Sequence, residues 1–148
     1  MPSAASPIVI LAGARTPMGR FQGGLSPLTA TDLGAAAISG ALDRSGMTGS
    51  DVDFAYLGNV VAAGTGQVPA RRASADAGIP LTVPSTLLNR ACLSGMHAIH
   101  LASQMIRLGE ADTVVAGGME SMTNAPYLLT KARGGYRIGD GTVVDSMM

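Results

Sequence analysis

The only cysteine of the chain, Cys92, lies where a strand is expected to give way to a helix. Backbone N–H groups in the first turn of a helix have no partner within the helix and together carry a partial positive charge. A thiol at this position is therefore biased toward its nucleophilic thiolate form. The same N–H groups could stabilise a developing oxyanion. Because free cysteines are often inert core residues, it is the position that makes Cys92 a candidate nucleophile.

The two histidines, His97 and His100, are expected on the helix that follows Cys92. Side chains several residues along a helix lie away from its N-terminal tip, so we expect neither histidine to act as a base for the thiol. As a metal-binding pair they lack the third protein ligand that even an open catalytic zinc site requires. We therefore expect both to be core or rim residues, and we expect no metal site.

Strands that alternate with helices are needed to position these side chains. Short apolar or β-branched runs bounded by turn residues predict the strands. Thr31 and Asp32 are a plausible cap for the first helix, Gly46 ends it, Pro69 begins the second helix, and Gly109 ends the third. The predicted strands are residues 7–12, 51–63, 85–91 and 112–116, and the predicted helices begin at residues 33, 69 and 94.

This alternation predicts an α/β fold, with a parallel or mixed sheet that is built from right-handed crossovers and covered by helices. The helix expected at 94–108 is apolar nearly all round, so we expect it to be central in the core. After Gly118 the sequence is rich in turn residues and this rhythm is lost. We therefore expect one α/β domain at residues 1–118, with a flexible start, and the beginning of another unit at residues 119–148.

Composition narrows the classes of function. The 10 lysines and arginines balance the 10 aspartates and glutamates among 148 residues, so no overall positive field attracts nucleic acid or an anionic membrane surface. No run approaches the roughly 20 apolar residues of a membrane-spanning helix, and the N-terminus lacks the pattern of a secretory signal. A single free cysteine suits a reducing compartment. We therefore expect a cytoplasmic protein that binds neither nucleic acid nor membranes.

Four stretches of the sequence, in order, resemble the thiolase family. Residues 89–129 contain an Asn-x-x-Cys-x-Ser-Gly signature around Cys92 and, further on, the run Gly-Gly-Met-Glu-Ser-Met. Two earlier stretches are also similar to thiolases, namely IVILAGARTPMGRFQGGL at residues 8–25 and GNVVAAGTGQVPARRAS at residues 58–74. Four matches in the expected order are far more specific than one motif, so the chain resembles the N-terminal portion of a thiolase.

The resemblance implies acyl transfer through Cys92. Its thiol would accept an acyl group from an acyl-CoA, and this group would then condense with acetyl-CoA; in reverse, CoA would cleave a 3-oxoacyl-CoA. The backbone N–H of Cys92 would contribute to an oxyanion site, and Gly95 would permit close approach at the helix start. Coenzyme A and acetyl-CoA would be substrates, with no permanently bound cofactor. The complete protein would be a homo-oligomer, a dimer or a tetramer, with residues 85–91 near the dimer interface.

The resemblance also implies residues that this chain does not contain. Thiolases place a Gly-His-Pro histidine, an Asn-Glu-Ala-Phe asparagine and a second, proton-carrying cysteine later in their sequences, and none of these motifs occurs here. Residues 1–118 would be the thiolase N-terminal domain without its last strand, and residues 119–148 would begin the loop domain that holds CoA. Three interpretations stay open. The chain is an incomplete part of an acetyl-CoA acetyltransferase or 3-oxoacyl-CoA thiolase, or a non-catalytic remnant that acts in binding or subunit pairing. The third is a relative of the sterol-carrier thiolases or ketoacyl synthases with the same acyltransferase chemistry, although the Gly-Gly-Met-Glu-Ser-Met run weighs against a synthase.

Several cationic side chains are weaker candidates for contacts with CoA. Lys131, Arg133 and Arg137 form a cluster that could bind the nucleotide, although solvated loop charges are the usual explanation for such residues. Arg71 and Arg72 could also bind phosphate, because guanidinium groups do so well. For this second pair we expect surface or interface pairing instead.

Two methionines are weak candidates for an acyl pocket. Met119 and Met122 could line such a pocket near the thiol, although core packing explains methionines at least as often. The flanking Glu120 and Ser121 resemble residues of the thiolase family, but the sequence alone indicates no role for them. The Gly-Thr-Gly run at residues 64–66 predicts a turn, since the rest of a dinucleotide-binding pattern is absent.

Overall fold

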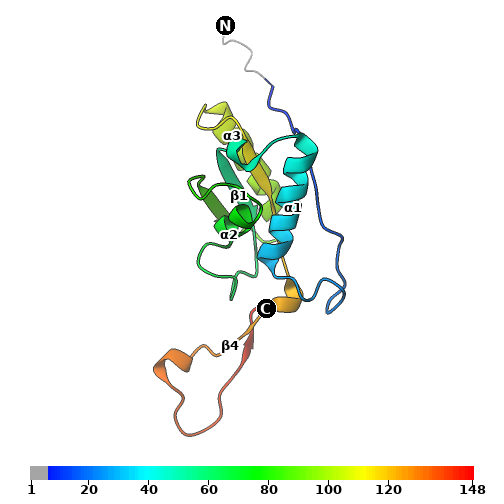
Figure 1. Ribbon diagram of the computed structural model, residues 1–148. Coiled ribbons are helices and arrows are strands. Elements are labelled where there is room, and N and C mark those ends of the chain that lie inside the picture. The colour runs from blue at the N-terminus through cyan, green and yellow to red at the C-terminus, as the bar shows by residue number, and fades with distance from the viewer. Residues whose placement is uncertain (1–6) are drawn as a thin grey trace.

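A three-stranded parallel sheet lies between two layers of helices in the computed structural model, which describes residues 7–148 (Figure 1). The flexible start expected at residues 1–6 lies outside the described residues. The strands of this sheet are β1 (Phe54–Gly58), β2 (Ser85–Leu88) and β3 (Val114–Gly118), and the helices are α1 (Ala30–Ser45), α2 (Pro69–Asp76) and α3 (Ser94–Arg107). Short 3-10 turns occupy Gly49–Asp51, Met122–Asn124 and Ala132–Gly134.

The predicted α/β class is confirmed, and the sheet of this domain is parallel throughout rather than mixed. Strand β1 is central, and its residue Ala55 lies beside Ser85 of β2 on one side and Val115 of β3 on the other. All three strands are shorter than their predicted ranges or shifted by two residues. The helix starts predicted at Pro69 and Ser94 are confirmed.

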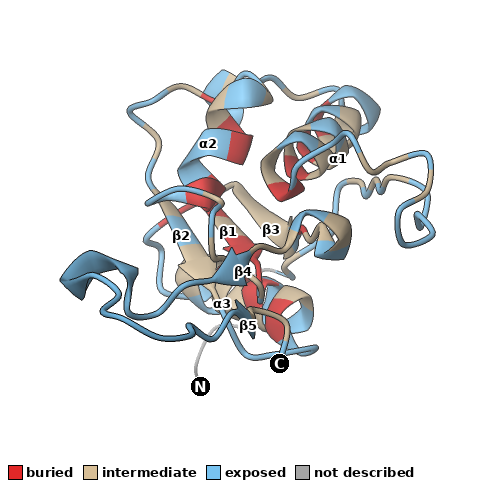
Figure 2. Cartoon of the chain, turned by 90° about the horizontal axis from the view of Figure 1, so that it is seen from below, coloured by how far each residue is buried: buried red, intermediate tan, exposed pale blue. Residues whose placement is uncertain are grey.

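The two faces of the sheet meet different helices (Figure 2). Leu57 of β1 packs against the core that α1 and α2 form, with Ile38 and Ala73 among its buried members. Neighbouring residues of a strand point to opposite faces, so the next residue, Gly58, meets the start of α3 instead. Burial of a leucine such as Leu57 contributes about 1.5–3 kcal/mol. The packing of helices on both faces of the sheet therefore fixes where α3 begins.

Helix α1 begins at Ala30, three residues earlier than predicted. Thr29, rather than Thr31 or Asp32, is the N-cap, and Asp32 occupies the third helical position of a capping box. The Thr29 hydroxyl donates to Asp32 Oδ2 at 2.6 Å, and the Thr29 backbone N–H donates to the same oxygen at 2.8 Å. These two hydrogen bonds lower the pKa of the Asp32 carboxyl. The predicted end at Gly46 is confirmed by its left-handed φ of 72°.

The strand predicted at residues 7–12 is not formed. This segment has no regular structure and leaves Val9, Ile10 and Leu11 exposed by 64, 81 and 61%. It runs beside α1 (Figure 1), where Arg44 Nη1 donates to the Gly13 carbonyl oxygen at 2.7 Å. An apolar run becomes a buried strand only when neighbouring strands pair with it, and within residues 7–148 none does.

Helix α3 is not the fully buried helix that its composition predicts. Its face toward the sheet buries Ser94, Ala98 and Ala102, whereas Met96 and Ile99 are 70% and 49% exposed. The outer face of the helix therefore leaves much of its apolar surface exposed. The small residues on the inner face let the helix lie close to β1 and β3, with which it makes most of its contacts.

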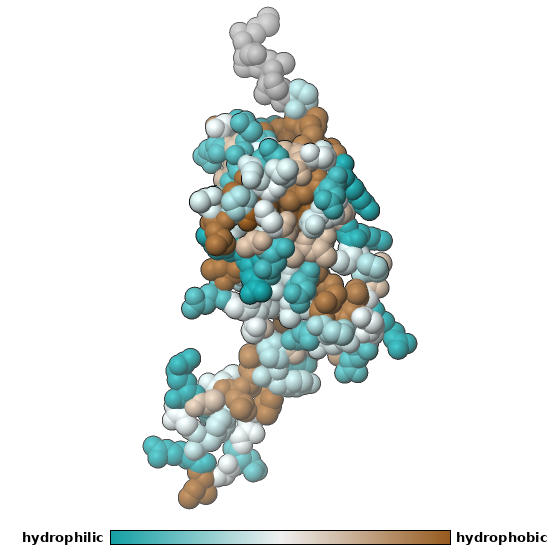
Figure 3. Space-filling view, in the orientation of Figure 1, coloured by the Kyte–Doolittle hydropathy of each residue, from teal (hydrophilic) through white to brown (hydrophobic). Residues whose placement is uncertain are grey.

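The chain leaves the sheet after Gly118 and forms an extended arm. Two short antiparallel strands, β4 (Tyr127–Leu128) and β5 (Val144–Asp145), pair at the base of this arm. The residues between them are all exposed, and the space-filling view shows the arm projecting from the body (Figure 3). No helix among residues 7–148 is long and apolar enough to cross a membrane.

Candidate active site

Cys92 is exposed in the turn between β2 and α3, two residues before the first residue of the helix. The strand β2 ends at Leu88, so five residues make the whole connection. Because β2 pairs with β1 and α3 packs on β1 and β3, both ends of this turn are fixed by the sheet. The predicted position of Cys92 at a strand-to-helix junction is confirmed.

The turn that contains Cys92 is held by side-chain hydrogen bonds from both of its ends. Ser94 Oγ accepts from the Arg90 N–H at 2.8 Å and donates to the Ala91 carbonyl oxygen at 2.6 Å. Asn89 Oδ1 accepts from the Ala91 N–H at 3.1 Å. Ala91 itself has a φ of 49°, in the left-handed region that alanine rarely adopts. The residue before Cys92 is therefore held in a single, strained conformation.

Glycine allows the close approach beneath this turn, at Gly58 rather than at Gly95. A Cβ atom built on Gly58 would lie 2.6 Å from Ser94 Cβ and 3.1 Å from the Gly95 nitrogen. A Cβ atom on Gly95 would meet nothing nearer than 4.0 Å, so the role expected for Gly95 is not required by space. The position at which only glycine fits is therefore Gly58, the last residue of β1.

Glu120, just after β3, binds the turn that follows β1. Its Oε1 accepts from Asn59 Nδ2 at 2.6 Å, its Oε2 accepts from the Val60 N–H at 2.8 Å, and both oxygens lie 3.3 Å from the Val61 nitrogen. The Val60 carbonyl oxygen in turn accepts from Asn89 Nδ2 at 3.2 Å. The turn after β1 thus links Glu120 to the residue that shapes the Cys92 turn.

The backbone N–H groups around Cys92 differ in whether they already have a partner. Those of Leu93 and Ser94 donate to the carbonyl oxygens of Arg90 and Ala91, respectively. Within residues 7–148, the N–H of Cys92 donates to no backbone or side-chain oxygen. An exposed thiol beside an unpaired N–H at a helix start can attack a carbonyl carbon while a donor faces the oxygen that becomes negative.

The histidines lie on α3, beyond the turn. His97 Nδ1 is 3.5 Å from Arg90 Nη1, and its ring stacks on that of His100 with centroids 6.0 Å apart. No hydrogen bond joins either ring to Cys92 in the described part of the chain. Among these residues, no group of three or more His, Cys, Asp or Glu side chains is arranged to hold a metal ion.

The cationic residues fall into two groups, one paired locally and one exposed on the arm. Arg72 forms an ion pair with Asp76, which raises the pKa of the arginine, and Arg71 donates to the Leu81 carbonyl oxygen. Both arginines are therefore engaged in local pairing. The three candidates for nucleotide contact are exposed on the arm, away from the sheet, as Figure 1 shows for this segment: Lys131, Arg133 and Arg137.

The two methionines take different places in the structure. Met119 is buried in the core that α1 and α2 form. Met122 is exposed by 56% and lines a surface groove with Arg15, Phe21 and Glu120. Core packing therefore accounts for Met119, and Cys92 is absent from the residues that line the groove of Met122.

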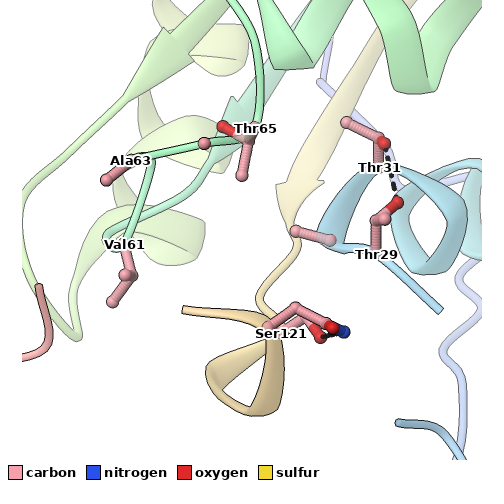
Figure 4. A pocket seen from close by; sticks show the side chains of 9 residues that line it. Thr29, Thr31, Val61, Ala63, Thr65 and Ser121 are labelled. Carbon is pink, nitrogen blue, oxygen red and sulfur yellow. Dashed lines mark hydrogen bonds between the residues drawn. The ribbon is translucent and has the colours of Figure 1, made fainter. Parts of the chain in front are cut away.

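A small cavity of about 120 Å³ lies beside the turn that Glu120 binds. Figure 4 shows Thr29 and Thr31 from the start of α1 on one side, and Val61 and Thr65 on the other. The cavity is lined by small polar and apolar side chains, and Cys92 is not among them.

Sequence reasoning missed the residues that shape the site. No structural role was predicted for three residues within the thiolase-like stretches: Gly58, Asn89 and Ser94. Asparagine and serine next to a predicted helix start do indicate turn-forming hydrogen bonds. Glu120 had no assigned role, because its partners lie 59 to 61 residues away in the sequence.

Comparison with known proteins identifies one family. The sequence pattern of the thiolase N-terminal domain matches residues 8–148. The chain is 51% identical over 139 residues to a probable acetyl-CoA acetyltransferase of Mycolicibacterium smegmatis, and 52% identical over 139 residues to one of Mycobacterium tuberculosis. It is also 49% identical over 142 residues to the cytosolic acetyl-CoA acetyltransferase ERG10 of Gibberella zeae.

These alignments cover most of this chain and a minority of each relative. They include 94% of this chain for the two mycobacterial proteins and 96% for the fungal one. They include only 36, 35 and 36% of the respective relatives. The chain therefore spans about a third of the length of the curated relatives it matches.

Proposed function

This chain belongs to the thiolase family, and on that premise we propose that it provides the acyl-accepting cysteine of an acetyl-CoA C-acyltransferase. The acyl donor is an acyl-CoA, and Cys92 is the nucleophile. Acetyl-CoA acetyltransferases among the relatives support this class of substrate. Coenzyme A and its thioesters are substrates here, so the proposal requires no permanently bound cofactor.

The proposed reaction has two covalent steps. The Cys92 sulfur first bonds to the acyl carbon of an acyl-CoA, the bond from that carbon to the CoA sulfur breaks, and CoA leaves with the proton of the thiol. Acetyl-CoA then loses a proton from its methyl carbon, and this carbon attacks the acyl carbon. The bond from the acyl carbon to the Cys92 sulfur breaks, and the sulfur regains a proton. Thiolysis of a 3-oxoacyl-CoA is the same sequence in reverse.

The single observation that supports this role is the placement of Cys92. It is a free, exposed thiol in a turn whose two ends are fixed by the sheet, and its own N–H has no partner within residues 7–148. That N–H can stabilise the oxyanion formed when the acyl carbonyl is attacked. Within residues 7–148 neither histidine forms a hydrogen bond with the thiol, so the proposal assigns the general base to residues outside this chain.

The arm suits the role of a substrate-binding loop. We assign residues 119–148 to the start of the thiolase loop domain and residues 1–118 to the N-terminal α/β domain. Exposed Lys131, Arg133 and Arg137 could then bind the phosphates of CoA, and Met122 could contact the acyl chain or the pantetheine. These assignments rest on the family resemblance and on exposure.

The proposed assembly is a homo-oligomer in the cytoplasm. Strand β2 is an edge of the sheet, so its outer side is open to pair with a second copy of the protein. Relatives include a cytosolic acetyl-CoA acetyltransferase and a mitochondrial one from Danio rerio, and the cytoplasm is the location we propose for this chain.

An isotope-exchange assay tests the proposed covalent step. A protein that forms an acyl-cysteine should transfer isotopically labelled CoA into acetyl-CoA without any net condensation, because the first step alone is reversible. The assay uses the protein purified as its gene encodes it. We expect exchange that saturates with acetyl-CoA and stops when Cys92 is alkylated by iodoacetamide.

Two outcomes would oppose the proposal. Absence of exchange from folded protein, both alone and with the C-terminal half of a relative supplied, would favour a non-catalytic role in binding or pairing. Exchange that survives complete alkylation of Cys92 would assign the acyl group to another residue.

A further inference from the structure

A carboxylate from the end of β3 is connected to the Cys92 turn through three successive hydrogen-bonded links. Glu120 accepts the N–H of Val60, the carbonyl oxygen of Val60 accepts from Asn89, and the amide oxygen of Asn89 accepts the N–H of Ala91, the neighbour of Cys92. The distances are 2.8, 3.2 and 3.1 Å in that order. Glu120 therefore holds Val60, Val60 holds the Asn89 side chain, and this side chain holds Ala91.

The turn at residues 59–61 depends on Glu120 for its conformation. The two carboxylate oxygens face donors from three consecutive residues, namely Asn59 Nδ2 and the N–H groups of Val60 and Val61. An ionised carboxylate only accepts hydrogen bonds and can serve all of these donors at once. No uncharged side chain of the same size offers two oxygens that only accept.

The side chain of Asn59 shows how closely this site is fitted. It is 1% exposed, its Nδ2 donates to both Glu120 and the Met119 carbonyl oxygen, and its Oδ1 has no partner among the described residues. With two acceptors on one side, the amide group cannot turn over without placing oxygen against oxygen. The carboxylate therefore fixes the orientation of a buried side chain as well as the backbone beside it.

The same turn reaches the site from the opposite direction. Asn59 donates its backbone N–H to the Leu88 carbonyl oxygen at the end of β2. The Gly58 carbonyl oxygen accepts the N–H of Met119, which directly precedes Glu120. The ends of all three strands thus meet at this turn, and the Cys92 turn starts from one of them.

We propose that Glu120 is a positioning residue for Cys92, acting through the 59–61 turn and Asn89 to hold Ala91 in its left-handed conformation. This inference rests on the proposed function, because it concerns the acyl acceptor of that reaction. The carboxylate touches neither the thiol nor, in this role, the substrate. Its loss should therefore slow the acylation step without weakening the binding of acetyl-CoA.

The test is the CoA exchange assay applied to Glu120→Gln in the protein as its gene encodes it. We expect the saturating exchange rate to fall by about 10- to 100-fold, as for a nucleophile displaced by a fraction of an ångström. The KM for acetyl-CoA should stay within about threefold of its original value. A raised KM with an unchanged saturating rate would instead make Glu120 a substrate-binding residue and overturn the proposal.

The other glutamate of the chain provides the matched control. Glu110 is exposed after α3, and its carboxylate forms no hydrogen bond or ion pair in the part of the chain that the structure describes. Glu110→Gln removes the same charge and should leave both the exchange rate and the KM unchanged. If Glu110→Gln and Glu120→Gln lower the rate equally, net charge explains the effect and the positioning role is wrong.

A double-mutant cycle tests the route through Asn89. Asn89→Asp keeps the oxygen that faces Ala91 but removes the donor to Val60, so it should lower the exchange rate by a similar factor. If both residues act through one connection, the double variant should lose about as much as the more impaired single variant. Losses that multiply fully would show independent effects and contradict the proposed route.

The outcomes separate this inference from the proposed function. Absence of exchange in the unmodified protein, both alone and with the C-terminal half of a relative supplied, rejects the proposed function. Normal exchange in the unmodified protein and an equal rate in Glu120→Gln reject only the positioning role. If Glu120→Gln does not fold, as judged by circular dichroism, Asn89→Asp decides alone, and an unchanged rate in that variant overturns the proposal.

Discussion

Replacement of Cys92 with serine is expected to lower kcat for acyl transfer by about 10⁴-fold or more. A hydroxyl is far less acidic than a thiol and is a poorer nucleophile toward a thioester, so the first covalent step should become rate-limiting. The side chain is exposed, and its replacement removes no core contact. Substitutions of this kind change the free energy of unfolding by about 0.5 kcal/mol or less.

Steady-state kinetics and thermal unfolding of Cys92→Ser check this expectation together. Serine keeps the size of the side chain, so a loss of activity with an unchanged melting temperature identifies a chemical role. Residual activity within tenfold of the unmodified protein would mean that Cys92 is not the acyl acceptor.

Replacement of Gly58 with alanine is expected to damage both stability and catalysis. The added Cβ atom would lie 2.6 Å from Ser94 Cβ and 3.0 Å from the Ser94 carbonyl carbon, so the start of α3 must move. Overpacking of this kind costs about 1–3 kcal/mol in the free energy of unfolding. Because Ser94 binds Arg90 and Ala91, its displacement should also shift Cys92 and lower kcat by about 100-fold.

Gly117 provides the matched control for Gly58→Ala. It lies in β3 directly beside Leu57, and a Cβ atom built there would meet nothing within 4 Å. Gly117→Ala should therefore retain activity and leave the free energy of unfolding unchanged or slightly raised. Denaturant unfolding and kcat of the two variants can be compared directly. Equal behaviour of Gly58→Ala and Gly117→Ala would contradict the close packing of α3 on β1.

The ends of elements were predictable where single residues decide them. Gly46 ends α1 with a left-handed φ and Pro69 begins α2 at its first residue, because these residues restrict the backbone locally. Burial was less predictable. The apolar composition of α3 shows which side chains can be buried, whereas the exposure of Met96 and Ile99 depends on what packs against the outer face.

The strand expected at residues 7–12 was wrong for the same reason. Val9, Ile10 and Leu11 have the side chains of a buried strand, but a strand also requires partners for its backbone hydrogen bonds. Pairing is a property of the tertiary structure. No run of residues read by itself indicates whether those partners are present.

The position of the proposed nucleophile was predictable, and the residues that hold it in place were not. Cys92 is recognisable because its position in the chain, between a strand and a helix, is local information. Glu120 and Gly58 act on it through contacts with residues 36 or more positions away. Such contacts follow from the order β2-β1-β3 of the sheet, and no local sequence pattern predicts this order.

The central claim is that Cys92 accepts the acyl group, and mass spectrometry of the protein quenched in acid shortly after mixing with acetyl-CoA tests it most directly. The claim predicts a gain of one acetyl group per chain, located by peptide mapping on the peptide that contains Cys92 and absent from Cys92→Ser. An acetyl group on another residue, or an equal gain of mass in Cys92→Ser, would contradict it.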